Sequence, residues 1–135
     1  MFEHVLFPLD TAFENMNKIL KDTGFCIFSV PYNSMGNTVE HFPSLYNYSV
    51  ERLGESWVLT NHRKDGVTET FDNLCFHGGE GQNLEMRRFS LPDLKNHFKN
   101  AGFKDLHVHD KDIPEFGIIH EAKDSFIITA RKVIA

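Results

Sequence analysis

The chain has 135 residues, of which 41% are hydrophobic and 24% charged, values typical of one soluble globular domain. Its net charge is −5 and its Lys and Arg residues are scattered, which argues against nucleic acid or an acidic membrane as the main partner, because phosphate binding needs clustered positive charge. No stretch approaches the roughly 20 consecutive apolar residues that span a bilayer, so no membrane segment is expected.

The cysteine content favours a reducing environment. Cys26 and Cys75 lie within apolar stretches and lack C-x-x-C spacing, so we expect two buried, reduced thiols and a cytoplasmic location. The 13 Phe residues favour a core built largely on aromatic packing.

Residues 9–22 are predicted to form an amphipathic helix. Residues 11–14, Thr-Ala-Phe-Glu, have the form of a capping box, and Gly24 suits the left-handed residue that ends such a helix. The apolar positions recur three and four residues apart and therefore share one face: Leu9, Ala12, Phe13, Met16, Ile19 and Leu20.

Residues 25–31, FCIFSVP, are predicted to form a strand buried on both faces, as in parallel sheets. A helix, a Gly turn and a buried strand make half of a right-handed crossover unit, and only residues 1–7 are available to supply the strand before the helix. One edge of the 25–30 strand then has no obvious neighbour. Because bare apolar edges recruit other chains, we expect a homo-oligomer with residues 1–7 or 25–30 at the contact.

The next segments are a loop and a hairpin. Residues 32–54 show no clear period and are interpreted as a long loop with one helical turn. Residues 55–74 alternate on either side of Asp65-Gly66, which predicts a β-hairpin with these two residues in its turn.

The last third predicts a helix and two strands. Ser90 is a candidate N-cap for a helix that tolerates Pro92 in its first turn and ends at Gly102. Strands are predicted at 104–110 and 125–132.

The segment FEHV…LDTAFENMNKILKDTGFCIFSVPY is similar to the stretch after the fourth strand in class I S-adenosylmethionine-dependent methyltransferases. In that family an acidic-His pair follows the fourth strand, and a helix leads to a fifth strand that ends in Val-Pro. The segments MRRFSLPDLKNHFKNAGF and DIPEFGII…SFIITARK resemble the last helix and the final antiparallel strand pair of the same fold.

The middle segment, DGVTETFDNLCFHGGEGQNLEMRRFS, resembles the insert of a bacterial subgroup often found near polysaccharide-modifying genes. In that subgroup an aromatic-His-Gly-Asp-Pro sequence precedes a strand with paired arginines. Here Phe76-His77-Gly78-Gly79 stands in its place and lacks the Asp and the Pro.

The resemblance implies an α/β fold: a partial Rossmann-like methyltransferase sheet (second half, strands 4/5-7-6) with two main helices and an inserted β-hairpin. Residues 1–135 would form a single partial domain, with an insert or lid at about 32–90. The implied activity is methyl transfer from S-adenosylmethionine to a small molecule or saccharide.

The family's cofactor-binding features lie before the region of resemblance. These are a Gly-rich turn after the first strand and an acidic residue at the end of the second. The chain alone is therefore expected to be inactive, and its Gly cluster, HGGEG, precedes a strand-like run and is not a copy of that turn. The alternative is a non-catalytic oligomerisation or protein-interaction module derived from the fold.

Three candidate site residues come from these motifs. Glu3 and His4 match the acidic-His pair, so the resemblance implies a cofactor-binding role for Glu3 and a catalytic role for His4. For the chain by itself the alternative is a disordered terminal dipeptide. His77 can present its imidazole to a pocket as the general base that deprotonates an acceptor hydroxyl, and the alternative is a loop histidine bonded to backbone.

Further candidates are for substrate binding. Arg87 and Arg88 should face opposite ways on a strand, so only one of them, taken here as Arg88, is a candidate for binding a phosphate or carboxylate. Tyr32 and Trp57 are the aromatic candidates. Either a lid over a sugar-like acceptor or ordinary packing accounts for these two and for Phe42, Tyr46 and Tyr48.

His107 and His109 form an H-x-H pattern that suggests metal ligands together with Asp110 or His120. Solvent-facing positions on a half-buried strand explain this pattern better, so no metal is expected. A metal-dependent, β-rich enzyme that uses His77, His107 and His109 is a further alternative.

Overall fold

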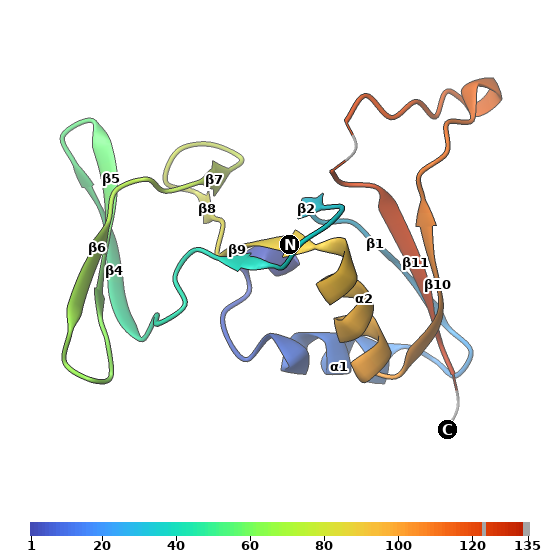
Figure 1. Ribbon diagram of the computed structural model, residues 1–135, viewed down its shortest axis with the longest axis horizontal. Helices are drawn as coiled ribbons and strands as arrows, with labels where there is room; N and C mark the ends of the chain where they lie inside the picture. The colour runs from blue at the N-terminus through green and yellow to red at the C-terminus, as the bar shows by residue number, and fades with distance from the viewer. Residues whose placement is uncertain (123, 134–135) are drawn as a thin grey trace. The chain divides into compact units, whose positions relative to one another are not determined.

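The computed structural model describes residues 1–122 and 124–133, which fold as two compact units. Unit 1 comprises residues 1–39 and 88–135, and unit 2 comprises residues 40–87. Figure 1 shows the helices and strands of the two units. The chain is a mixed α/β protein with small sheets.

The main sheet of unit 1 has the strand order β1-β11-β10. Its strands are β1 (Phe25–Phe28), β10 (Phe103–His109) and β11 (Ile127–Lys132). The middle strand, β11, runs antiparallel to both neighbours, so β1 and β10 point in the same direction. The predicted strands at 25–30, 104–110 and 125–132 are therefore present, and they are neighbours in one sheet.

Two helices, α1 (Leu9–Ile19) and α2 (Leu91–Asn100), pack against one face of this sheet (Figure 1). Phe13 of α1 lies edge-on to Phe98 of α2, with ring centroids 5.3 Å apart, and Phe98 has the same relation to Phe28 of β1 at 5.2 Å. The aromatic core expected from the Phe content is thus present in this unit. Its fully or nearly fully buried members are Leu9, Phe13, Phe28, Val30, Tyr32, Phe89, Leu94, Phe98, Phe103, Ile128 and Ala130.

The opposite face of the sheet is open, which corrects the expectation that the 25–31 strand is buried on both faces. Cys26 and Phe28 turn inward, whereas Phe25 is 57% and Ile27 69% exposed. Alternation along the strand sends every second side chain to the uncovered face. Burial on both faces requires a second layer, which the described residues do not provide.

The ends of the helices test the local predictions. The capping box at residues 11–14 is wrong: α1 begins at Leu9 and has no side-chain cap. Thr23, with φ of 61°, takes the left-handed conformation predicted for Gly24. In α2 the predictions are confirmed, because the backbone N–H of Asp93 donates to Ser90 Oγ at 3.2 Å and Gly102 follows the helix with φ of 85°.

Three strands lie where residues 32–54 were predicted to form a loop, two of them short and one, β4 (Asn47–Leu53), of seven residues, so that prediction is wrong. β2 (Tyr32–Asn33) pairs in parallel with β9 (Arg87–Ser90), in a sheet of order β2-β9-β3 that includes β3 (Val39–Glu40). β2 and β3 are too short to show an alternating pattern in the sequence, and β4 is exposed at six of its seven positions, so it has no buried face to produce one. The remaining elements of unit 1 are the 3-10 turns η1 (Phe2–His4) and η2 (Pro114–Phe116).

Unit 2 is built on antiparallel strands in the order β4-β5-β6. The strands are β4 (Asn47–Leu53), β5 (Ser56–His62) and β6 (Thr68–Phe71), followed by the pair β7 (Phe76–His77) and β8 (Asn83–Leu84). The predicted hairpin is confirmed, with Gly66 at φ of 86° in its turn. The core of the unit is small and consists of Phe42, Leu59, Leu84 and Met86.

Among the described residues, none of the helices is both long enough and apolar enough to cross a bilayer.

Candidate functional site

The hairpin of β7 and β8 brings three chemically active side chains together in unit 2. Phe76 pairs with Leu84 and His77 with Asn83, and the backbone N–H of Glu85 donates to the carbonyl of Cys75 at 2.8 Å. Cys75 therefore lies opposite Glu85. Because alternate residues of a strand share a face, His77 projects on the same side as Cys75.

Glu85 joins two histidines through its carboxylate. Its Oε2 lies 2.6 Å from Nε2 of His77, and its Oε1 lies 2.8 Å from Nε2 of His41. His41 is held beside this strand by its own backbone N–H, which donates to the carbonyl of Met86 at 2.9 Å. We call Cys75, His77, Glu85 and His41 the hairpin cluster.

Burial makes these contacts necessary. Glu85 is only 5% exposed, and an ionised carboxylate is costly to bury unless charged or hydrogen-bonding partners surround it. The two imidazoles provide such partners while remaining about one-third exposed. One side of the cluster is thus dry and the other is open to a ligand.

The same arrangement sets the chemistry of the histidines. An ionised carboxylate only accepts hydrogen bonds, so Nε2 of each ring donates to Glu85. The basic nitrogen of each neutral ring is then Nδ1. A carboxylate that orients an imidazole in this way supports general-base chemistry, as the Asp does in a catalytic triad.

A second ion pair lies at the edge of the same unit. The guanidinium of Arg87 is almost completely buried, and its Nε donates to Oε1 of Glu40 at 2.7 Å. Arg88, next along β9, belongs to unit 1 and is partly exposed. The expectation that one arginine faces inward and the other outward is confirmed.

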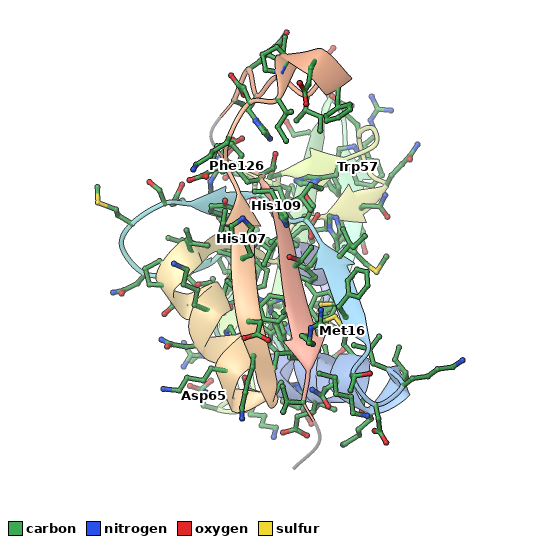
Figure 2. All side chains as sticks on the ribbon, turned by 90° about the vertical axis from the view of Figure 1, so that its right-hand side faces the viewer. Met16, Trp57, Asp65, His107, His109 and Phe126 are labelled. Atoms are coloured by element: carbon green, nitrogen blue, oxygen red, sulfur yellow. The ribbon has the colours of Figure 1, made fainter. Side chains whose placement is uncertain are left out.

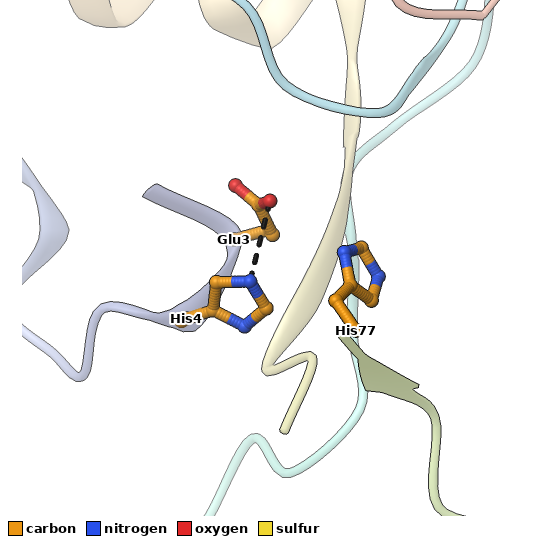
Figure 3. Close-up of side chains that lie close together, drawn as sticks. All are labelled: Glu3, His4 and His77. Atoms are coloured by element: carbon orange, nitrogen blue, oxygen red, sulfur yellow. Dashed lines mark ion pairs between the residues drawn. The ribbon is translucent and has the colours of Figure 1, made fainter. Parts of the chain in front are cut away.

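Glu3 and His4 lie on η1 in unit 1 (Figure 3). His4 Nε2 lies 3.3 Å from Oε1 of Glu3, and the amino terminus pairs with the other oxygen. Burial opposes ionisation of Glu3, but its contacts with the terminal ammonium, a backbone amide and His4 outweigh this effect and lower the pKa of the carboxyl. The alternative of a disordered dipeptide is wrong, since Glu3 is 5% exposed and η1 is ordered.

Tyr32 and Arg88 are close to each other in unit 1. Tyr32 pairs with Phe89 across β2 and β9 and is buried. Burial raises the pKa of the Tyr32 hydroxyl, and the Asp110 and Asp124 carboxylates add to this effect. Arg88 donates to Oδ1 of Asn33 at 3.1 Å and to Oδ2 of Asp124 at 3.3 Å, so any anionic substrate must compete with Asp124.

Trp57 lies in unit 2, half-buried on β5. Its ring packs edge-on against Phe76 at 5.7 Å, and Gly81 approaches it so closely that an added Cβ would fall 2.2 Å from Cζ2 of the indole. The other aromatic candidates divide: Phe42 is a core residue, whereas Tyr46 is exposed. Packing accounts for Phe42 and for the contact of Trp57 with Phe76.

His107 and His109 are exposed on β10, as the solvent-facing interpretation predicts (Figure 2). His109 Nε2 lies 3.0 Å from Oγ1 of Thr129. Both rings border an apolar cavity on the open face of the sheet, together with Ile27, Ile118 and Ile127.

The cysteines differ from expectation. Cys75 is exposed rather than buried, and Cys26 is only partly buried. Burial raises the pKa of the Cys26 thiol.

Of the residues in the hairpin cluster, His77 is predicted from the sequence as a site residue, whereas His41 and Glu85 are not. His41 is 36 positions from His77, so spacing gives no signal. A weak signal exists for Glu85, a carboxylate between Leu84 and Met86 on a strand-like run, where an acidic side chain must be paired if it is buried.

No family model matches the chain, and no curated protein matches it.

Proposed function

We propose that the chain is a methyltransferase-like domain of the S-adenosylmethionine-dependent class that acts on a small molecule or saccharide. The observation that supports this proposal is the position of β11 between β1 and β10, antiparallel to both. In the proposed assignment β1, β11 and β10 are strands 5, 7 and 6 of a partial Rossmann-like sheet.

The order of the elements along the chain agrees with this assignment. α1 precedes β1 and α2 precedes β10, so each of the two strands that share a direction follows a helix. Both helices pack on the same face of the sheet. Unit 2 is then an insertion between strand 5 and the last helix.

In the proposed reaction His77 is the general base. Its Nε2–H donates to Glu85 while Nδ1 takes the proton of an acceptor hydroxyl. S-adenosylmethionine would supply the methyl group to the acceptor oxygen and leave as S-adenosylhomocysteine, and Nδ1 of His77 would hold the proton released by the acceptor. Positioning of the two reactants supplies most of the acceleration in such an in-line transfer.

The other candidate roles remain within this proposal. Within unit 1, Glu3 would bind the cofactor, His4 would act in catalysis, and Tyr32 and Arg88 are candidates for acceptor binding. Trp57 is the corresponding candidate within unit 2. The Gly-rich cofactor turn of the family is not present in residues 1–135, so another segment or chain must supply it.

The test is cofactor binding with and without that segment. Radiolabelled S-adenosylmethionine is titrated into the chain alone and into the chain joined to the product of the coding sequence immediately upstream. We expect binding and methyl transfer only in the joined form, and a loss of transfer with unchanged binding in His77→Gln. His107→Gln, an exposed histidine of β10, is the matched control and should retain activity.

A non-catalytic interaction module is the second candidate, favoured by the exposed Phe25 and Ile27 on the open sheet face. The two candidates differ in one readout. A joined protein that binds no S-adenosylmethionine, or an upstream sequence without a strand followed by a Gly-rich turn, contradicts the transferase proposal and favours the module.

A further inference from the structure

The hairpin cluster has the composition of a transition-metal site. Cys, His and Glu are the side chains that bind zinc-class divalent ions, through sulfur, imidazole nitrogen and carboxylate oxygen. One ligand atom each from Cys75, His77 and Glu85 lies within 4.8 Å of the other two. All three residues belong to unit 2.

The backbone explains how the three ligands meet. Cys75 and His77 are two residues apart on one strand and share a face, and Glu85 is fixed opposite Cys75 by the 2.8 Å backbone hydrogen bond. The hairpin carries the sequence Cys-x-His at the start of its first strand and a Glu directly after its second strand. It therefore presents three ligand atoms on one side.

His41 holds the other oxygen of the same carboxylate. Its Nε2 is 2.8 Å from Oε1 of Glu85, while Nε2 of His77 is 2.6 Å from Oε2. Ligand atoms lie about 2.0–2.3 Å from zinc and hence about 3–4 Å from one another. Nε2 of His77 and Oε2 of Glu85 therefore need to separate by roughly 1 Å to admit an ion between them.

We propose that unit 2 binds one divalent ion of the zinc class through Cys75, His77 and Glu85, with His41 hydrogen-bonded to the same carboxylate. The thiolate of Cys75 and the carboxylate of Glu85 together carry two negative charges, which neutralise a divalent ion. A neutral site suits the buried position of Glu85. Binding removes the thiol proton and moves the ring proton of neutral His77 from Nε2 to Nδ1. The net release is one proton when the thiol begins protonated.

This inference goes beyond the proposed function and does not depend on it. A bound ion holds His77 with its proton on Nδ1, so the loaded protein does not use this histidine as the base. Metal binding is measured without S-adenosylmethionine, so failure of either proposal leaves the other intact.

The expected benefit is stability of unit 2. Its core is small, and a metal that binds only the folded state adds to the free energy of unfolding. Heating the full chain with and without one equivalent of Zn²⁺ should show a higher melting temperature with the ion.

The experiment is a titration of the full chain, first treated with chelator, with Co²⁺ and then with Zn²⁺ as competitor. We expect one equivalent of Co²⁺ and a thiolate-to-cobalt charge-transfer band that Zn²⁺ abolishes. Cys75→Ser should eliminate the band, whereas Cys26→Ser, which changes the other thiol, should leave it. His41→Asn and His77→Asn should each weaken binding at least about 10-fold.

The exposed pair His107 and His109 provides the control for nonspecific histidine binding. The double variant His107→Asn/His109→Asn should bind Co²⁺ as the parent does. Absence of binding, a band that persists in Cys75→Ser, or affinity lost in the His107/His109 variant instead of His77→Asn would overturn the proposal. Since Cys75 is exposed, Cys75→Ser keeps the test decisive even if a histidine variant fails to fold.

Discussion

Single side chains determine both the core of unit 1 and the chemistry of unit 2. Phe13 is fully buried and contacts Phe2, Phe28 and Phe98 through ring centroids 4.8–5.9 Å apart. In unit 2 the central side chain is Glu85, whose buried carboxylate contacts the imidazoles of His41 and His77. Loss of either residue would leave its neighbours without partners: apolar rings in the first case and polar nitrogens in the second.

Replacement of Phe13 by Ser should destabilise the protein by roughly 3 kcal/mol or more, because the change removes a buried ring and places a hydroxyl among apolar neighbours. Urea unfolding followed by circular dichroism measures the loss. Ile19→Ser on the same helix is the control, since Ile19 is 82% exposed and its change should cost little. Similar losses for both variants would contradict this account of the core.

At the scale of elements, Asp93 and Ser90 join the start of α2 to Thr38 through hydrogen bonds. Oδ2 of Asp93 accepts a hydrogen bond from the backbone N–H of Thr38 at 2.6 Å, and Oγ1 of Thr38 accepts one from the backbone N–H of Ser90 at 3.1 Å. The backbone and hydroxyl of Thr38, the hydroxyl of Ser90 and the nearby His97 lower the pKa of the Asp93 carboxyl. The helix dipole favours the same ionised form.

A lowered folded-state pKa makes the stability contributed by Asp93 dependent on pH. This contribution is complete above the ordinary carboxyl pKa and is lost as pH falls through the lowered folded value, below about pH 5. The difference in unfolding free energy between the parent and Asp93→Asn should therefore narrow as pH falls from neutral. Asp72→Asn, an exposed acid of unit 2, controls for the general loss of one negative charge, and a constant difference for Asp93→Asn would refute the linkage.

At the scale of the whole molecule, the main sheet of unit 1 has an apolar, incompletely covered border. Within the described residues β1 has β11 as its only strand neighbour, and Phe25 and Ile27 project from its open face. Such an edge pairs readily with another chain. The homo-oligomer expected from the sequence stays a prediction with this physical basis.

Sedimentation at increasing concentration should show self-association that Ile27→Lys weakens, because the charge disfavours burial of this strand. Val67→Lys is the matched control, since Val67 is also an exposed β-branched residue but lies in the hairpin turn of unit 2. A monodisperse monomer at high concentration would rule out the oligomer.

Local patterns predicted both helices, the strands of the main sheet and the β5–β6 hairpin, but not β4, whose residues were interpreted as a loop. Three of these predictions depend only on a few neighbouring residues, so the sequence suffices to make them. They are the helical spacing of Phe13, Met16 and Leu20, the Ser90 cap and the Asp65-Gly66 turn. The strands β2, β3 and β7 are too short for such a pattern.

Only the tertiary structure decided which side chains meet. The sequence offered His77 with no partner, and the fold supplied Glu85 from the opposite strand and His41 from 36 residues earlier. It also left one face of β1 open, although the apolar sequence of that strand suits burial on both sides. Contacts between distant residues and the number of layers over a sheet arise from the packing of the whole chain, and no local periodicity records them.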